Sequence, residues 1–310
     1  NVNQPGVVLN SSGNGGQSVL AGQLAANGKL GGNAARLILN EVVGANPSLL
    51  LGKQEVFGML ADYVLANPNG ITSKDSGFIN TGRASLVVGS PVLQDGRLDS
   101  VMLGNGAGRN GRLQVTGQLD GARVLDLLAP KIELDGTIRS EQAINVLAGR
   151  NEVRLTSDQG LQLSAMRDVP PPPPPPPPKR EICILPWLCI PDLLSVFTPP
   201  PSQPAADPGP AQVLDSRVLG SLQSGRIRLY NTDQSATTTV QASINAQQGL
   251  AADMAGKLVI QGSHIQAGDA DLRAGSLKLA ALRQQQDQQQ RDSTGGLKNL
   301  LQLWTLDTDK

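Results

Sequence analysis

Few residues of this chain have the types and spacing that catalysis or metal binding requires. His264 is the only histidine, and it lies next to Ser263 and five positions before Asp269. A metal ion needs several ligands at suitable spacing, a Ser-His-Asp arrangement needs a pocket, and the residues around His264 offer neither. We therefore expect His264 to be a surface residue, and we expect no catalytic residue, no metal and no cofactor.

Two carboxylates stand just before glycines, Asp120 before Gly121 and Asp135 before Gly136. Carboxylates paired on one face can cleave polysaccharides or hold calcium. Asp-Gly is more often only a turn, because glycine accepts the positive φ that tight turns need. We interpret both dipeptides as corners of the chain.

The composition indicates a chain built from aliphatic strands. Only 2% of its 310 residues are aromatic, so Leu, Val, Ile and Ala must fill the interior, and 35 glycines suggest many turns. The 26 basic and 26 acidic residues cancel, which argues against a nucleic-acid partner. No apolar run approaches the roughly 18 residues of a transmembrane helix. The length fits one elongated domain or two ordinary ones.

One turn has a strong signal in the sequence. Asn67-Pro68-Asn69-Gly70-Ile71 follows the largely apolar segment 56–65 and precedes Gly77-Phe78-Ile79-Asn80. Pro68 fixes φ for the first central position of a turn, and Gly70 tolerates positive φ. The sequence therefore predicts a corner here with a strand on each side. Residues 34–43 are also predicted to form a strand, because of their Val and Ile content.

A repeat of apolar alternation begins after residue 97. Positions 113, 115, 117 and 119 recur 19 residues later at 132, 134, 136 and 138, and positions 258 and 260 recur 19 residues later at 277 and 279. Alternation with a period of two, repeated at about 20 residues with glycine at a corner, is typical of one coil of a β-solenoid. Segments 144–147 and 153–155 alternate without this period, and we interpret them as irregular coils.

Proline divides the chain. Residues 170–178 are nine consecutive prolines, which form polyproline II and cannot join a sheet. A second proline-rich segment runs from 199 to 210. The apolar segment between them, 182–197, could bind a partner or a membrane surface or could fold back on the solenoid, and we favour the second. The expected organisation is a solenoid domain at 1–168, a proline-rich insertion at 169–211, further coils at 212–281, and a Gln-rich polar tail with a short amphipathic segment at 282–310.

The motifs of residues 1–160 resemble a known family. Asn67–Ile71, Gly77–Asn80, Arg83-Ala84-Ser85-Leu86 and Asn33–Val42 together resemble the secretion domain of filamentous-haemagglutinin-like exoproteins. These are the secreted members of bacterial two-partner secretion systems. The resemblance implies an all-β fold, a right-handed parallel β-helix (β-solenoid) with a capped N-terminal end, here with a proline-rich insertion.

The resemblance also implies a function and partners. Such a domain is recognised in the periplasm of a Gram-negative bacterium by an outer-membrane pore protein, is secreted to the medium or cell surface, and folds there coil upon coil without nucleotide energy. The matching motif positions, which are candidates for transporter recognition or for a structural corner, are Asn27, Leu30, Asn67, Pro68, Asn69, Gly70 and Ile71. Family members act as adhesins, haemagglutinins, cytolysins or contact-dependent inhibitors, so a host-cell or bacterial surface receptor is a further expected partner.

Three features depart from the family pattern. The family's first Asn-Pro-Asn-Leu motif is Asn27-Gly28-Lys29-Leu30 here, which keeps only its Asn and Leu. The Cys-x-x-Cys of many relatives is Ser73-Lys74-Asp75-Ser76, so no disulfide is expected there. The N-terminal cap looks truncated. Because the sequence starts at Asn1 without Met or a leader, we expect any signal peptide to have been removed.

Cys183 and Cys189 are the only cysteines, with five residues between them. They could form one tight disulfide or remain two buried thiols. Because an exported chain rarely leaves paired cysteines reduced, we favour the disulfide.

Other classes of function remain as alternatives. A β-helical carbohydrate-active enzyme would need clustered carboxylates or basic residues on one face, and aromatic rings that stack on sugars, which this sequence largely lacks. A pure adhesin, or a fragment of a contact-dependent inhibition or cytolysin exoprotein, is compatible with export. The leading hypothesis is a non-enzymatic secretion domain.

Overall fold

The structure, a computed structural model, describes residues 1–104, 111–164, 181–185, 188–191 and 214–280. These residues form β-strands and turns, apart from the short 3-10 helix η1 (Gly28–Leu30). Within the described ranges, no helix has the length and hydropathy of a membrane span. The proline run, the Gln-rich tail and the amphipathic segment expected from the sequence lie outside the described residues.

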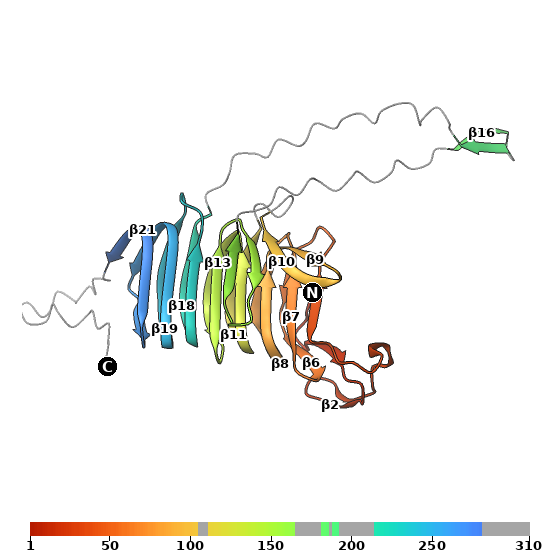
Figure 1. Cartoon of the computed structure of the whole chain (residues 1–310), viewed down its shortest axis with the longest axis horizontal. Coiled ribbons are helices and arrows are strands. Elements are labelled where there is room, and N and C mark those ends of the chain that lie inside the picture. Colours follow the sequence, from red (N-terminus) through yellow and green to blue (C-terminus); the bar gives the residue numbers. More distant parts are fainter. Residues whose placement is uncertain (105–110, 165–180, 186–187, 192–213, 281–310) are drawn as a thin grey trace, which may run out of the picture. The chain divides into compact units, whose positions relative to one another are not determined.

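The strands of one large sheet wind into a parallel β-helix. Neighbouring strands lie side by side and are stacked one after another along the solenoid (Figure 1). In chain order they are β1 (Val7–Ser11), β4 (Leu37–Glu41), β5 (Ser48–Leu50), β6 (Lys53–Gly58), β7 (Ala61–Ala66), β8 (Ile71–Val87), β11 (Arg112–Ala129), β12 (Lys131–Arg139), β13 (Ala143–Ala148), β18 (Ser216–Asn231), β19 (Thr237–Gln261), β20 (His264–Ala267) and β21 (Ala270–Ala280). Neighbouring strands pair in parallel, for example β8 with β11 and β18 with β19. The predicted all-β parallel β-helix is confirmed.

The 19-residue repeat corresponds to the observed strand pairing. Each residue of β11 lies beside its counterpart in β12: Leu113 beside Ile132, Val115 beside Leu134 and Leu119 beside Ile138. The later pairs are confirmed in the same way, with Leu258 beside Leu277 and Ile260 beside Leu279. Stacking places like residues above one another, so the repeat in the sequence becomes aliphatic columns in the fold.

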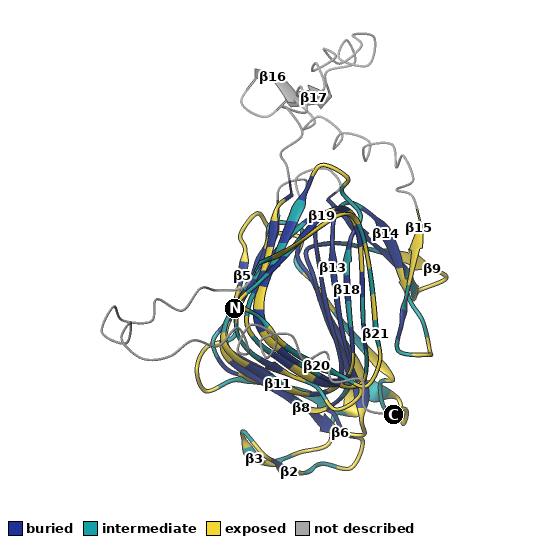
Figure 2. Cartoon of the chain, turned by 90° about the vertical axis from the view of Figure 1, so that its left-hand side faces the viewer, coloured by how far each residue is buried: buried dark blue, intermediate teal, exposed yellow. Residues whose placement is uncertain are grey.

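Aliphatic side chains fill the interior of the coils. Much of the strand length that forms these coils is buried (Figure 2). One column consists of Ile71, Leu113 and Ile132, each at most 1% exposed. Rings meet at Tyr63 and Phe78, whose centroids are 5.9 Å apart. Burial of one such aliphatic side chain stabilises a fold by about 1.5–3 kcal/mol. The repeated aliphatic columns therefore supply the buried apolar surface that a compact core obtains in part from aromatic residues.

Glycine occupies one corner in three stacked coils. Gly117, Gly136 and Gly220 lie in register. A Cβ on Gly136 would lie 2.1 Å from the carbonyl oxygen of Gly117, and one on Gly220 would lie 2.3 Å from that of Gly136. The backbones approach too closely for any side chain, which explains why the repeat carries glycine at this corner.

The predicted strands on each side of the Asn67 corner are confirmed as β7 and β8, and Gly58, with a φ of 113°, separates β6 from β7 within the apolar segment 56–65. One expectation about the coils needs correction. Residues 144–147 do not form an irregular coil. They belong to β13, which pairs in regular parallel register with β11 and β18. The predicted strand within 34–43 is confirmed as β4.

A second sheet, here called the outer sheet, pairs antiparallel. It consists of β9 (Gly89–Gln94), β10 (Arg97–Leu103), β14 (Glu152–Leu155) and β15 (Leu161–Ser164), in the order β15-β14-β10-β9. The interpretation of 153–155 as a coil is wrong, because residues 156–160 turn the chain back and pair β14 with β15. Val101, Leu103 and Val153 of this sheet share a buried apolar cluster with Leu128 and Leu147 of the coils.

Residues 168–212 separate from the coils as a unit of their own. Within it the structure describes the backbones of β16 (Glu181–Leu185) and β17 (Leu188–Pro191), which pair antiparallel with Cys183 opposite Cys189. Facing residues of an antiparallel pair have Cα atoms about 4.5–5.5 Å apart, a separation that a disulfide can span. The disulfide itself stays a prediction.

Candidate functional site

The predicted corner at Asn67–Ile71 joins β7 to β8. The carbonyl of Asn67 accepts a hydrogen bond from the amide of Gly70, at 3.2 Å, which closes a four-residue turn. Pro68 takes the first central position, and Gly70 has a φ of 116°. The corner that was predicted from Pro68 and Gly70 is therefore present in the structure. Ile71 follows the turn as the first residue of β8, and its side chain lies in the core, where it is 1% exposed.

The side chain of Asn67 is fully buried, with 0% exposure. Its Nδ2 donates to the carbonyl of Asn46, at 3.0 Å, and to Oγ of Ser48, at 2.8 Å. Its Oδ1 accepts from the backbone amide of Asn69, at 2.9 Å. Asn69 in turn donates from Nδ2 to the carbonyl of Gly44, at 2.7 Å. The turn is thus tied to the loop that leads into β5, and the Asn67 amide has no free group to offer a partner.

Asn27 makes the same kind of connection at a different turn. It caps η1, where its Oδ1 accepts from the amide of Lys29 at 3.1 Å. Its Nδ2 donates to the carbonyl of Asn10 in β1, at 2.8 Å. Leu30 ends η1 and is half-buried. The two motif turns hold different strands, because Asn27 binds the end of β1 and Asn67 binds the start of β5.

A buried carboxylate holds the N-terminal hairpin formed by β2 (Gly16–Ser18) and β3 (Gly22–Leu24). Glu55 of β6 is 3% exposed and accepts from Ser18 Oγ at 2.7 Å and from the amides of Val19 and Leu20, both at 2.8 Å. Burial by itself raises the pKa of Glu55, but these three hydrogen bonds outweigh it and hold the pKa below its ordinary value. The carboxylate therefore stays ionised inside the fold.

We expect acid to loosen this hairpin. Because the pKa of Glu55 is lower in the folded chain than unfolded, its stabilisation is complete above the ordinary value of 4.5 and is lost as the pH falls through the folded value. Glu55→Gln should lower the free energy of unfolding by about 1–3 kcal/mol at neutral pH and weaken its dependence on pH under acid conditions. Urea unfolding measured at neutral and acid pH tests both effects. Glu41→Gln, at an exposed position of β4, is the matched control. An unchanged pH dependence in the Glu55 variant would contradict the assignment.

A buried ion pair lies between the coils and the outer sheet. Arg83 of β8 is 9% exposed and Asp126 of β11 is 0% exposed. Arg83 Nε lies 2.6 Å from Oδ2 of Asp126, and Arg83 Nη2 lies 3.0 Å from its Oδ1. Ser85 Oγ and Asn145 Nδ2 also donate to Asp126, at 2.6 Å and 2.7 Å. Both oxygens of the buried carboxylate therefore accept two bonds each, which makes a buried charge tolerable.

Arg83 and Asn145, together with Arg228 of β18, also bind the turn between β14 and β15. Their donors reach its backbone carbonyls: Arg83 to Thr156 at 2.7 Å and to Gly160 at 2.8 Å, and Asn145 and Arg228 to Gln159 at 2.9 Å and 3.1 Å. We call Arg83, Ser85, Asp126, Asn145 and Arg228 the Arg83 cluster. It fastens the outer sheet to four strands of the coils, β8, β11, β13 and β18.

None of these groups is arranged for catalysis. In the part of the chain that the structure describes, no group of three or more His, Cys, Asp or Glu side chains could hold a metal ion. His264 is exposed, as predicted. Asp120 lies beside Gly77 and Asp135 beside Thr116, so the two carboxylates stand in different columns. Asp120 instead pairs with Lys53, at 3.9 Å.

Sequence reasoning missed Glu55 and the Arg83 cluster. Arg83 falls inside a motif that resembles the family, but Asp126 lies 43 residues away and no spacing links the two. A usable signal was present in Val124-Leu125-Asp126-Leu127-Leu128, where one charge interrupts an apolar strand. A charge in such a position must have a buried partner.

A family model described as the TPS secretion domain matches residues 1–174. The "Hemolysin" of Serratia marcescens is 40% identical over 257 residues, which are 79% of this chain and 13% of that protein. The "Hemolysin" of Proteus mirabilis is 40% identical over 255 residues, 81% of this chain and 13% of that protein. The "tRNA nuclease CdiA-2" of Burkholderia pseudomallei (strain 1026b) is 35% identical over 174 residues, 54% of this chain and 5% of that protein. The chain therefore spans only a small part of each of these relatives.

A solved structure has a similar fold. The crystal structure of a filamentous hemagglutinin secretion domain superposes with a TM-score of 0.64 at 23% sequence identity, and the match covers 90% of this chain and 84% of that one. The region matched by the family model contains both motif turns, Glu55, Arg83 and Asp126.

Proposed function

Because the chain belongs to the family of TPS secretion domains, we propose that a cognate outer-membrane transporter recognises its β-helix region in the periplasm and exports the exoprotein that carries it. The family directs secretion from Gram-negative bacteria to the cell surface or the medium, and its domain is not catalytic. The observation that carries the proposal is the family match over residues 1–174. That region includes every coil from β1 to β13 and the outer sheet.

We propose that Asn67 supports export by shaping its corner rather than by touching the transporter. Its buried side chain already has partners for its donors and its acceptor. Pro68 and Asn69 are only half-buried, so they are the residues of this turn that a partner can reach. Asn27 has the same holding role at the end of β1.

The geometry supports a mechanism in which each coil is the template for the next. A finished coil presents strand edges and the ends of its aliphatic columns, and the following segment pairs with them in parallel. Each added coil buries several aliphatic side chains at about 1.5–3 kcal/mol each. The entropy of ordering the chain offsets part of this gain. The surplus favours the folded state outside the cell, so transport requires no nucleotide.

Site-specific photocrosslinking in the periplasm tests this recognition. We expect a photoreactive residue in place of Asn69 to crosslink to the transporter during export. The same residue in place of Leu277, which is 50% exposed in β21, is the matched control and should crosslink less. Equal crosslinking at both positions, or none at Asn69 while export proceeds, would contradict recognition through this turn.

We further propose that the longer exoprotein is of the hemolysin type. Identity of 40% to two proteins named "Hemolysin" extends over 257 and 255 residues, whereas identity to a tRNA nuclease is 35% over 174. Any lytic, adhesive or toxic activity, and any surface receptor, would belong to other regions of that protein. Red-cell lysis by bacteria that express the complete gene with its transporter tests this proposal. Inhibition of neighbouring bacteria without lysis would contradict it.

We propose that residues 169–211 are an insertion between coils and that Cys183 and Cys189 are bonded in it. The antiparallel register of β16 and β17, which sets the two cysteines opposite each other, supports the bond. Mass spectrometry of the secreted chain after alkylation without reductant should find no modified thiol. Two alkylated cysteines would contradict the disulfide.

A further inference from the structure

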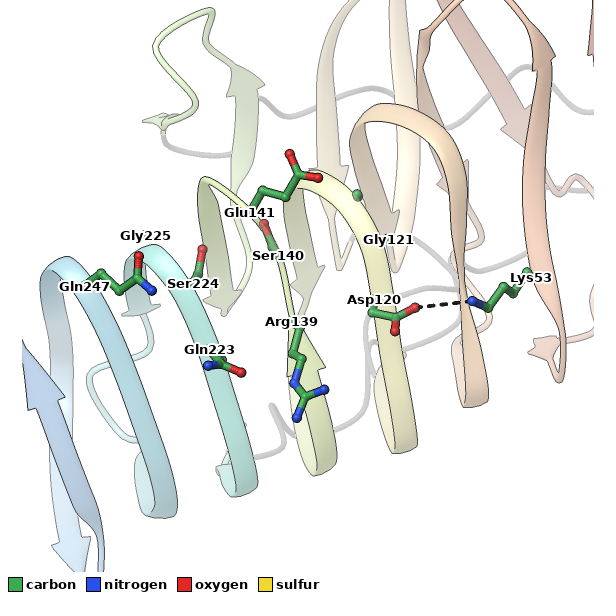
Figure 3. A pocket seen from close by; sticks show the side chains of 11 residues that line it. Lys53, Asp120, Gly121, Arg139, Ser140, Glu141, Gln223, Ser224, Gly225 and Gln247 are labelled. Carbon is green, nitrogen blue, oxygen red and sulfur yellow. Dashed lines mark ion pairs between the residues drawn. The ribbon is translucent and has the colours of Figure 1, made fainter. Parts of the chain in front are cut away.

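A groove crosses several coils at one corner of the solenoid (Figure 3). It is an open groove of about 480 Å³, a volume within the range of small-ligand sites. Its lining comes from β11, β18 and β19, from the end of β12 and the segment that follows it, and from Lys53 at the start of β6. Its polar side chains include Asp120, Arg139, Glu141, Gln223, Ser224 and Gln247.

The charges in the groove cancel. Lys53 and Arg139 are its basic lining residues, and Asp120 and Glu141 are its acidic ones. The Lys53 ammonium lies 3.9 Å from the Asp120 carboxylate, and the Glu141 carboxylate lies 3.9 Å from the guanidinium of Arg123. A groove without net charge does not favour an anion or a cation. It fits a neutral ligand.

Three hydrogen-bonding side chains in the groove are available to a ligand. Arg139 and Gln223 lie side by side on adjacent coils, and Gln247 follows on the next coil (Figure 3). All three are exposed, and within the described residues no hydrogen bond or ion pair engages their side chains. Guanidinium and carboxamide groups together supply the donors and acceptors that hydroxyl groups bind.

A buried hydroxyl points to the same groove. Ser224 is 4% exposed, and its Oγ has no hydrogen-bond partner among the described residues. A buried hydroxyl without a partner is costly, so such a group in a native structure needs an explanation. A polar ligand in the groove would supply the missing bond.

Backbone groups along the groove already take part in hydrogen bonds between the coils. The amide of Ser140 donates to the carbonyl of Gln223 at 3.1 Å, and that of Arg226 donates to the carbonyl of Gln142 at 2.9 Å. The coils therefore present no free strand edge at this corner, and an added peptide strand would find no backbone partner. A ligand here is held by side chains.

We propose that this groove binds a neutral oligosaccharide, laid along the solenoid axis across successive coils. A neutral polyhydroxylated chain matches the uncharged balance, the row of free guanidinium and carboxamide groups, and the unpartnered Ser224 hydroxyl. Among the described residues no aromatic ring lines the groove, so affinity comes from hydrogen bonds and should be weak, on the order of millimolar. This binding is separate from export.

NMR titration of the full chain with maltohexaose, with cellohexaose and with an anionic hyaluronan hexamer tests the proposal. We expect at least one neutral hexasaccharide to shift the side-chain amide signals of Gln223 and Gln247, with little dependence on salt. The double variant Arg139→Ala, Gln223→Ala should weaken this binding by ~10-fold or more, as loss of two hydrogen-bonding groups implies. Arg217→Ala with Gln241→Ala, at exposed positions of β18 and β19 outside the groove, is the matched control and should bind normally.

Several outcomes would overturn the proposal. No shift with either neutral hexasaccharide means that the groove holds only water. Salt-sensitive binding of the anionic hexamer alone assigns the groove to a charged ligand. Loss of secretion in the double variant, while it still folds, assigns the groove to the transporter. Unchanged secretion with lost sugar binding supports the proposal, and it also separates this site from the proposed export function.

Discussion

Replacement of Arg83 by methionine should destabilise the chain by about 3–5 kcal/mol, because it leaves the Asp126 carboxylate buried without its counter-charge. Arg83 also donates to the carbonyls of Thr156 and Gly160, and these bonds are lost as well. The outer sheet should therefore detach before the coils unfold. Methionine keeps much of the side-chain volume, so the effect reports the lost charge and hydrogen bonds rather than a cavity.

Denaturant unfolding and hydrogen exchange measure this prediction together. The free energy of unfolding gives the size of the effect, and faster exchange at β14 and β15 shows which part opens. Arg217→Met, at an exposed position of β18, is the matched control and should change stability little. In a double-mutant cycle with Asp126→Asn, the coupling between the two sites should be about 1–3 kcal/mol. A coupling near zero would show that the ion pair does not hold the sheet.

Replacement of Asn67 by alanine should lower the free energy of unfolding by roughly 2–4 kcal/mol, because it removes the buried hydrogen bond to Ser48 Oγ together with two part-buried ones. The carbonyl of Asn46 and the amide of Asn69 each lose their bond to the Asn67 side chain. Asn67→Asp should be at least as damaging, since it keeps the acceptor for Asn69, cannot donate, and buries a charge. Secretion should fall in proportion to the loss of folding.

Parallel measurement of unfolding and of the secreted amount tests the role of Asn67. Asn245→Ala is the matched control, because Asn245 is half-buried in β19 and no hydrogen bond of its side chain occurs among the described residues. Both its stability and its export should stay close to those of the parent. An Asn67→Ala chain that folds with full stability but is not exported would contradict the structural role and favour direct recognition.

Local chemistry and repeats made much of the fold predictable. The recurrence of apolar positions 113–119 at 132–138 predicted the parallel register, because stacked coils bury like residues in columns. The turn at Asn67 was predictable because Pro68 and Gly70 fit only a few backbone conformations. The motif resemblance supplied the family, and the match over residues 1–174 confirmed it.

Contacts between distant segments were not predictable in this way. Residues 153–155 alternate like a coil strand, yet the turn at 156–160 sends them into the outer sheet. That turn is held by Arg83, which lies 73 residues before Thr156. In the same way, Glu55 reads as a solvated charge until the hairpin 36 residues before it donates the Val19 amide. Neither contact follows a repeat period or a local conformational propensity, so the sequence alone gives no signal of it.

The most direct test of the central claim is secretion of this chain, supplied with a signal peptide, in a Gram-negative host with and without the cognate transporter. The measured quantity is the fraction of the chain in the medium, with the periplasmic fraction as reference. If the chain is a two-partner secretion domain, it should reach the medium only when the transporter is present and should otherwise stay in the periplasm. Equal amounts in the medium with and without the transporter would contradict the claim.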